Sequence, residues 1–450
     1  MPFFMRLGLL WLLSAFCSAS FASIPAGRIN AINAQLAAGQ YQAAEKATLV
    51  LLESQQLATD DVNTLEALAS GFTAAGLRDQ AGTLLSKAAE LLGAPQTSSD
   101  RATLLRIGVS LQALNLRSQA AGILTRGIRI TGKDAADSLN AAGFQSLGDL
   151  AFETGDLEGA DSAYTNSETA LEADDLQARA ALLVRQIKLA VASTDAVQTR
   201  DYYKAYQGLL LQLTGDTSLA RMNLNVAASL MASGESTWAP DITLLIEQSA
   251  MIGSADAQLM SEVEQMRGQV AALSGQPDAA LKMLRRALAG LGSDATPAQT
   301  YRLYWQIGKL QAEAGEIDAA LKNYERAIAN LDRIRGELLQ GSTLVFTERV
   351  LPVYQGYIEL LLEKAKVRGQ EGKWLGQVQQ TLEGLNAAEI LDYFDDNCVL
   401  PRDVMSLSNT AAGTAVLYPI TLGTRPVLLV RTANGIFRFD LAVGNAELKS

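Results

Sequence analysis

Residues 304–328 read YWQIGKLQAEAGEIDAALKNYERAI, and this stretch decides the fold of the chain. Six of its positions carry aromatic or small residues in a fixed order, namely Tyr304, Gly308, Gly315, Ala320, Tyr324 and Ala327. A small residue lets two helix backbones approach closely, and an aromatic ring from the facing helix fills the space that is left. A glycine between them can adopt the left-handed backbone of a tight turn. The stretch therefore predicts two helices joined by a turn at Gly315.

The same order recurs along the chain at intervals near 40 residues. The small residues of the first helices lie at Ala69, Gly108, Gly148, Gly268 and Gly308, so successive gaps are 39, 40, 120 and 40 residues. The gap of 120 residues is three times 40, which predicts two degenerate units between Gly148 and Gly268. Each hairpin leaves a hydrophobic face that the next hairpin covers, so the spacing predicts a mainly α-helical solenoid.

The predicted packing positions are those where helices cross or turn. They are Gly108, Gly148, Gly155, Ala160, Tyr164, Gly268, Gly275, Ala280, Gly308, Gly315, Ala320, Tyr324 and Ala327. The alternative is a generic helical bundle in which glycine and alanine recur by chance. Five units that share one phase favour the solenoid.

The order of aromatic and small residues resembles the tetratricopeptide (TPR) repeat. Proteins with this repeat bind extended peptides or partner helices on the inner face of their first helices. In the best-matched unit those positions are Arg302, Trp305 and Lys309. An aromatic ring beside two cations could hold an acidic peptide through charge and stacking. The alternative is that these are ordinary solvated residues, with Trp305 packed on a neighbour.

The C-terminal part carries a second resemblance. Helical patterns with Phe346, Tyr354 and Tyr357 and with NAAEILDYF at 386–394 lead into three predicted strands. The strands span 414–423, 426–432 and 436–443, and the last two are joined by an Asn-Gly hairpin turn. This order resembles CHAT proteins, which are caspase-like cysteine peptidases that follow TPR repeats. The resemblance implies that the strands open a caspase-like α/β domain.

A three-stranded piece leaves an unpaired edge and an uncovered apolar face. We therefore expect the chain to be a fragment that ends inside the CHAT-like domain. The expected organisation is a signal peptide at 1–22, a TPR-like array at 23–335, a helical connector at 336–410 and a partial β region at 411–450.

The residues that CHAT peptidases need for catalysis are a histidine base and a cysteine nucleophile. The sequence has no histidine, and Cys398 precedes the first predicted strand, so no catalytic role is transferred to any residue. We interpret the chain as the partner-binding or regulatory part of a CHAT protein. The alternatives are the N-terminal fragment of a secreted cysteine peptidase and a non-enzymatic scaffold of the cell envelope.

Cofactor and metal sites are not predicted. The carboxylates of Glu389, Asp392, Asp395 and Asp396 gather near one helix end, where they could in principle hold a hard cation. The glycine spacing of a calcium loop is missing, which favours a solvated helix end. No glycine-rich phosphate-binding loop is found either, so no nucleotide is expected.

The first residues predict export. Arg6 precedes an apolar core at 7–16, and small residues flank Phe21, which indicates a signal peptide cleaved after Ala22. Acylation at Cys17 is the weaker alternative because bulky Phe16 precedes it. We expect a periplasmic or extracellular protein with no membrane span after cleavage.

The charge and cysteine content limit the partners and the crosslinks. The 37 basic and 48 acidic residues give a net charge of -11, or -12 once Arg6 is removed, which disfavours nucleic acid. After removal of the signal peptide Cys398 is the only cysteine, so an internal disulfide is impossible. The expected partner is a protein or a peptide.

Overall fold

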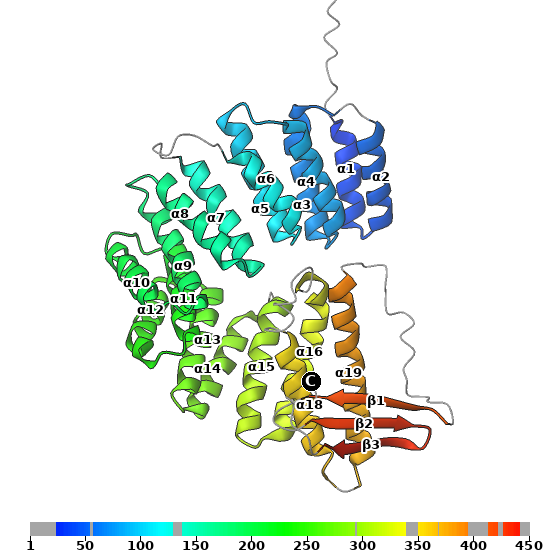
Figure 1. Ribbon diagram of the computed structural model, residues 1–450. Helices are drawn as coiled ribbons and strands as arrows, with labels where there is room; N and C mark the ends of the chain where they lie inside the picture. Colours follow the sequence, from blue (N-terminus) through cyan, green and yellow to red (C-terminus); the bar gives the residue numbers. More distant parts are fainter. Residues whose placement is uncertain are drawn as a thin grey trace, which may run out of the picture. The chain divides into compact units, whose positions relative to one another are not determined.

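The computed structural model describes residues 24–54, 57–128, 137–292, 295–338, 350–367, 369–394, 413–421 and 426–441. The side chains of residues 54, 335–338 and 387–394 are outside this description. The chain divides into two compact units, residues 1–127 and 128–450. Figure 1 labels the helices and strands of both units.

Unit 1 consists of three helical hairpins. Its elements are α1 (Ala26–Ala37), α2 (Tyr41–Ser54), the short 3-10 helix η1 (Thr59–Asp61), α3 (Val62–Ala74), α4 (Arg78–Leu92), α5 (Ser98–Ala113) and α6 (Arg117–Gly127). Helices pair in sequence order, α1 with α2, α3 with α4 and α5 with α6. Leu65, Phe72, Leu84 and Leu104 are fully buried between them, so apolar residues at helical spacing form the core.

Unit 2 begins with five more hairpins. They are α7 (Ser138–Glu153) with α8 (Leu157–Ala170), α9 (Leu176–Ala192) with α10 (Ala196–Leu210), α11 (Thr217–Ala232) with α12 (Ala239–Ile252), α13 (Ala257–Leu273) with α14 (Pro277–Gly290), and α15 (Pro297–Glu313) with α16 (Ile317–Leu338). A 3-10 helix, η2 (Ser236–Trp238), precedes α12. The hairpins α9–α10 and α11–α12 occupy the interval in which two degenerate units are predicted.

Each of the eight hairpins turns at one residue in the left-handed backbone region. These residues are Gly39, Gly76, Asn115, Gly155, Thr194, Gly234, Gly275 and Gly315, and their φ values lie between 56° and 80°. Successive turn residues are 37, 39, 40, 39, 40, 41 and 40 residues apart. At Gly315 the amide donates to the Ala312 carbonyl (3.0 Å) and the next amide donates to the Gln311 carbonyl (2.8 Å), which closes the end of α15.

The helices of a hairpin approach most closely where a glycine faces a large side chain. An ideal Cβ atom at Gly148 would lie 2.4 Å from Cε1 of Tyr164, and one at Gly308 would lie 2.9 Å from Cδ2 of Tyr324. Leucine takes the place of tyrosine opposite Gly108 and Gly268. Behind these contacts lie alanines with no exposed surface, Ala160, Ala280, Ala320 and Ala327. Only glycine leaves room for these rings and branched side chains.

The chain then forms two helices and a sheet. They are α18 (Leu351–Lys364), α19 (Glu371–Phe394), β1 (Ala415–Ile420), β2 (Val427–Thr432) and β3 (Gly435–Asp440). The strands form an antiparallel sheet in the order β1-β2-β3. All three predicted strands are present, and each is shorter than its predicted range. The predicted Asn-Gly turn joins β2 to β3.

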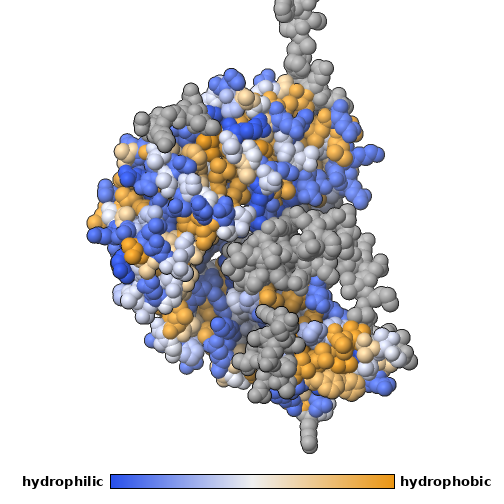
Figure 2. Space-filling model, viewed as in Figure 1, coloured by the Kyte–Doolittle hydropathy of each residue, from blue (hydrophilic) through white to orange (hydrophobic). Residues whose placement is uncertain are grey.

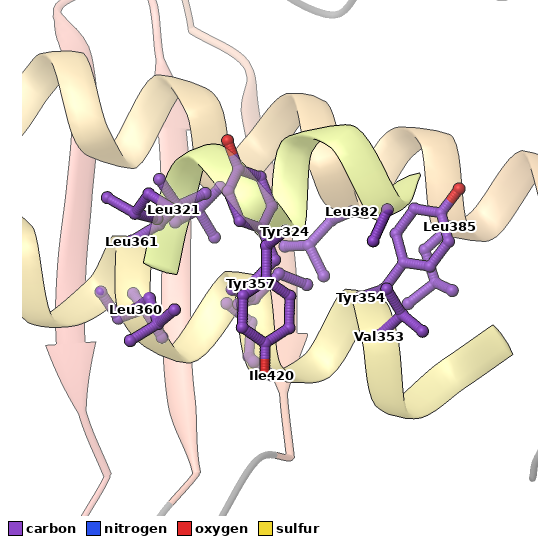
Figure 3. Close-up of a cluster of buried hydrophobic side chains, with 14 of the residues drawn as sticks. Leu321, Tyr324, Val353, Tyr354, Tyr357, Leu360, Leu361, Leu382, Leu385 and Ile420 are labelled. Atoms are coloured by element: carbon purple, nitrogen blue, oxygen red, sulfur yellow. The ribbon is translucent and has the colours of Figure 1, made fainter. Parts of the chain in front are cut away.

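One face of this sheet packs on the helices of unit 2. Tyr418, Ile420, Val427 and Leu429 belong to a buried cluster that also contains residues of α16, α18 and α19 (Figure 3). The hydroxyl of Tyr418 donates to Glu383 Oε1 of α19 at 2.8 Å. Apolar burial and a polar contact therefore fix the sheet to this helical layer.

Several sequence predictions concern residues outside this description. They are the signal peptide at 1–22 with Cys17, and also Phe346, Cys398, Asp395 and Asp396; the side chains of Glu389 and Asp392 on α19 are outside it as well. Across the described ranges, no helix is both long enough and apolar enough to cross a membrane. No group of three or more acidic or cysteine side chains in these ranges is placed to hold a metal ion.

Candidate functional site

A pocket of about 410 Å³ lies in unit 2 where the first helices of three consecutive hairpins meet. Its walls come from α11, α13 and α15, with one residue from α14. The lining residues are Met231, Gly268, Gln269, Ala272, Leu273, Leu284, Trp305, Gln306, Lys309, Leu310 and Glu313. Because first helices alternate with second helices along the chain, a pocket between first helices lies on one face of the stack.

The packing of the hairpins creates the apolar part of this pocket. At Gly268 an added Cβ atom would lie 2.9 Å from Cγ of Leu284, so the missing side chain lets Leu284 of α14 reach the pocket. Leu273 is 74% exposed although it is a large apolar residue at the end of α13. Met231 of α11 and Leu310 of α15 complete a lining that can accept an apolar group.

Trp305 belongs both to the pocket and to the core next to it. The ring is half-buried and packs against the cluster of α16 and α18. It also hydrogen-bonds to Tyr324. Burial raises the pKa of the Tyr324 hydroxyl to about 12, although the Trp305 hydrogen bond lowers it. The indole is therefore held in place before any ligand arrives.

Amide side chains and one cation form the polar part. Nε2 of Gln265 donates to Oε1 of Gln306 at 3.2 Å, a contact that bridges α13 and α15. Lys309 is exposed at the pocket, and no carboxylate of the described residues pairs with it. An unpaired ammonium beside an apolar hollow favours a ligand that carries a negative charge.

The structure separates the three residues that the sequence places in a groove. Trp305 and Lys309 line the pocket, whereas Arg302 does not. Nε of Arg302 donates to the hydroxyl of Tyr301 at 3.3 Å, and its guanidinium lies 5.8 Å from the centre of that ring. Arg302 is thus engaged one turn earlier on α15.

Sequence reasoning did not find the contributions of Met231 and Leu273. Both lie just before a turn residue, Met231 three positions before Gly234 and Leu273 two positions before Gly275. An alignment of the hairpins on their turn residues would have shown that large apolar side chains recur at the ends of first helices. The unit that contains Met231 is degenerate, so the glycine pattern alone does not identify it.

Unit 1 contains a different hollow, of about 380 Å³, along α4 and α6. Its charged residues include Lys87 and Glu90, which pair with each other at 3.0 Å. Ser86 donates to Gln119 at 2.9 Å across it. These polar groups satisfy each other, so this hollow offers less to a ligand than the pocket of unit 2.

No family model and no curated protein matches the sequence. Among solved structures, the chain is similar to a Rap protein complexed with competence and sporulation factor, with 13% identity over 75% of this chain and 100% of that one (TM-score 0.43). It is also similar to TTC0263, a TPR protein of Thermus thermophilus, with 18% identity over 58% and 99% of the chains (TM-score 0.28). The TPR2AB domain of yeast Sti1 with an HSP90 peptide gives 14% identity over 66% and 98% (TM-score 0.24).

The fold assignment rests on the hairpins of this chain. Eight helical hairpins with one turn position and one kind of close helix contact form a TPR-like arrangement, followed by a small antiparallel sheet. The predicted fold class is confirmed at this level.

Proposed function

We propose that this chain is a protein-interaction module that binds an extended peptide on the first-helix face of unit 2. The observation that carries the proposal is the pocket between α11, α13 and α15, where a fixed indole, apolar side chains and an unpaired lysine converge. Titratable groups arranged as nucleophile and base are not part of this pocket, so binding is the activity that its chemistry supports.

The lining residues define the ligand class. An apolar side chain of the peptide would occupy the space between Leu273, Leu284 and Trp305, and a carboxylate beside it would reach Lys309. The amides of Gln269 and Gln306 lie where the peptide backbone would pass, and each can donate or accept. The proposed ligand is therefore a peptide with an apolar residue next to an acidic one.

The test uses the full chain and a phage-displayed library of random 12-residue peptides. Peptides that bind the wild type and are lost on Leu273→Asp are synthesised with a fluorophore, and their affinity is measured by anisotropy. Leu273 is exposed, so the aspartate alters the pocket without burying a charge. We expect the selected peptides to share an apolar residue next to Asp or Glu.

Charge reversal then tests the role of the lysine. Lys309→Glu should weaken these peptides by about tenfold, which corresponds to about 1.4 kcal/mol. Lys282→Glu on α14 makes the same change of net charge at an exposed position outside the pocket, so it serves as the matched control. Equal losses for both variants would reduce the effect to overall charge and overturn the proposed site.

We further propose that the module is exported and is part of a CHAT protein. Support comes from the signal-peptide pattern at 1–22 and from the sequence resemblance of the C-terminal helices and strands to CHAT proteins. N-terminal sequencing of the protein from its native host should find Ser23 as the first residue. An intact Met1 in the cytoplasmic fraction would contradict export.

The CHAT proposal is tested on the gene. If the reading frame continues past Ser450 into further strands with a histidine and a cysteine, the module is the partner-binding half of a cysteine peptidase. A stop codon at that point would instead favour the alternative of a non-enzymatic scaffold in the cell envelope. The pocket proposal stands or falls independently of this result.

A further inference from the structure

The second face of the C-terminal sheet is apolar in two complete rows. Side chains alternate between the faces of a strand, so the strand register fixes which residues share a face. The first row is Leu417, Val430 and Phe437, and the second is Pro419, Leu428 and Phe439. Residues of the opposite set, such as Tyr418 and Leu429, point toward α18 and α19. We call the six residues of the two rows the outer face.

The outer face is open to solvent. Leu417 is 59% exposed, Phe437 46% and Phe439 51%, although large apolar side chains are normally covered. In Figure 2 a hydrophobic area lies where Figure 1 places the three strands. Neither row contains a charged residue. Contiguous apolar patches of this kind mark surfaces that bind other macromolecules.

The size of the outer face restricts what can cover it. Each strand has six residues, so the face is about 20 Å long, and three strands at about 4.8 Å spacing make it about 14 Å wide. Its footprint is therefore about 280 Å², whereas a stable dimer buries about 800 Å² on each partner. A second copy packed face to face would have too little contact.

A single α-helix matches these dimensions. A helix is about 10 Å in diameter, and about 13 residues of it span 20 Å. The nearest helices of this chain that the structure describes, α18 and α19, already contact the inner face. Arg438 shows this for α18, because its Nη1 donates to the Leu362 carbonyl at 2.9 Å. A helix on the outer face must therefore come from elsewhere.

We propose that the outer face docks an amphipathic helix of a partner protein through an uncharged apolar stripe. A charged side chain on that stripe would be desolvated without a partner, because the two rows contain only hydrocarbon side chains. This docking surface is separate from the peptide pocket of α11, α13 and α15. A partner could thus be held by a helix while its extended segment occupies the pocket.

The test compares the full chain with the double variant Leu417→Asp, Phe437→Asp. Random 16-residue phage-displayed peptides that bind the wild type and are lost on the double variant are sequenced and synthesised. We expect apolar residues at spacings of three and four with no charge between them on that stripe. Circular dichroism should show that such peptides become helical on binding, and the double variant should weaken them by at least about tenfold.

Two controls keep the result interpretable. Both substituted side chains point outward, so the double variant should keep the far-ultraviolet spectrum and thermal midpoint of the wild type. Leu211→Asp replaces a leucine that is 93% exposed on another part of unit 2, and it should leave the affinity unchanged.

Three results would overturn the inference. Selected peptides with alternating apolar residues would indicate strand addition at a sheet edge rather than a docked helix. A wild-type dimer in sedimentation equilibrium that the double variant abolishes would identify a second copy as the occupant. Failure to recover any peptide that distinguishes the two proteins would show that the outer face does not dock a helix.

Discussion

Thr194 is the residue whose backbone conformation fits its side chain least well. It occupies the turn between α9 and α10 with a φ of 56°, a position at which six of the eight hairpins have glycine. A left-handed backbone costs a residue with a Cβ atom about 1–2 kcal/mol, and branching at Cβ adds to the crowding. The hairpin forms despite this cost because its helices are packed on both sides.

Replacing Thr194 by glycine should stabilise unit 2. We expect Thr194→Gly to raise the free energy of unfolding by about 0.5–1 kcal/mol, since relief of the strained backbone outweighs the added freedom of the unfolded chain. Urea denaturation followed by circular dichroism measures this change. Gly155→Thr, at the same turn position of another hairpin, should lower the free energy of unfolding. Destabilisation by Thr194→Gly would mean that the threonine side chain contributes a contact of its own.

Gly148 tests the close helix contacts. Gly148→Ala should destabilise the protein by about 1–3 kcal/mol, because the new methyl group would overlap the ring of Tyr164. That ring cannot move freely, since its hydroxyl donates to Asp149 at 2.8 Å and Arg185 pairs with the same carboxylate at 2.9 Å.

The matched control is a helical glycine without such a neighbour. Gly208 lies in α10 with no atom within 4 Å of its ideal Cβ position. Gly208→Ala should therefore raise the free energy of unfolding by up to about 1 kcal/mol through helix propensity alone. If both alanine variants were stabilising, the contact of Gly148 with Tyr164 would not limit the residue at that position.

At the scale of elements, the register of β2 decides which side chains hold the sheet on its helices. Leu429 has no exposed surface, whereas its neighbour Leu428 is half-exposed on the outer face. We expect Leu429→Ala to lower the free energy of unfolding by about 2–4 kcal/mol because it leaves a cavity. Leu428→Ala should cost less than about 1 kcal/mol. Urea denaturation compares the two, and a reversed order would mean that the register is shifted by one residue.

The elements that the sequence predicts best are those with a strict pattern. The hairpins of Gly148, Gly268 and Gly308 follow from small residues at fixed spacing, and the strands follow from β-branched runs and the Asn-Gly turn. Asn115 and Thr194 hide two turns from a search for glycine, although they adopt the same backbone. The pairing of Leu417 with Val430 and Phe437 also had to come from the structure, because hairpin register depends on which face is buried.

For the whole molecule, buried tyrosines determine the response to alkaline pH. Burial, with nearby carboxylates, raises the pKa of Tyr324 and Tyr418 to about 12. The pKa values of four other tyrosines are raised too, with burial as the largest cause: Tyr164, Tyr203, Tyr206 and Tyr357. A tyrosine in an unfolded chain has a pKa of about 10. The folded state therefore keeps protons that the unfolded state loses.

Stability should fall as the pH rises above about 10. Between about pH 10 and 12 the unfolded state binds fewer protons than the folded state, so the free energy of unfolding decreases with pH, by up to about 1.4 kcal/mol per unit for each tyrosine. Below about pH 9 these tyrosines should have no effect. Urea midpoints at several pH values measure the decrease, and tyrosinate absorbance reports the titration. Ionisation of all the tyrosines near pH 10 in the folded protein would contradict the prediction.

The sequence predicts the composition of the molecule better than its division. A period near 40 residues gives the stack of hairpins, but the boundary between two compact units after Gly127 differs from the predicted boundary at 335. The pocket was predicted in part, since Trp305 and Lys309 line it while Arg302 turns to Tyr301. Contacts between units in the stack depend on side chains from three hairpins, and no single repeat pattern contains that information.

The constant position of the turn residue has a consequence for how such a gene can change. Seven successive intervals differ by no more than four residues, and each runs from one left-handed residue to the next. A recombination event that duplicates or deletes the coding segment between two such codons would rejoin the chain at an equivalent place in a hairpin. The number of hairpins could therefore grow or shrink by whole units over evolutionary time while every remaining turn kept its geometry.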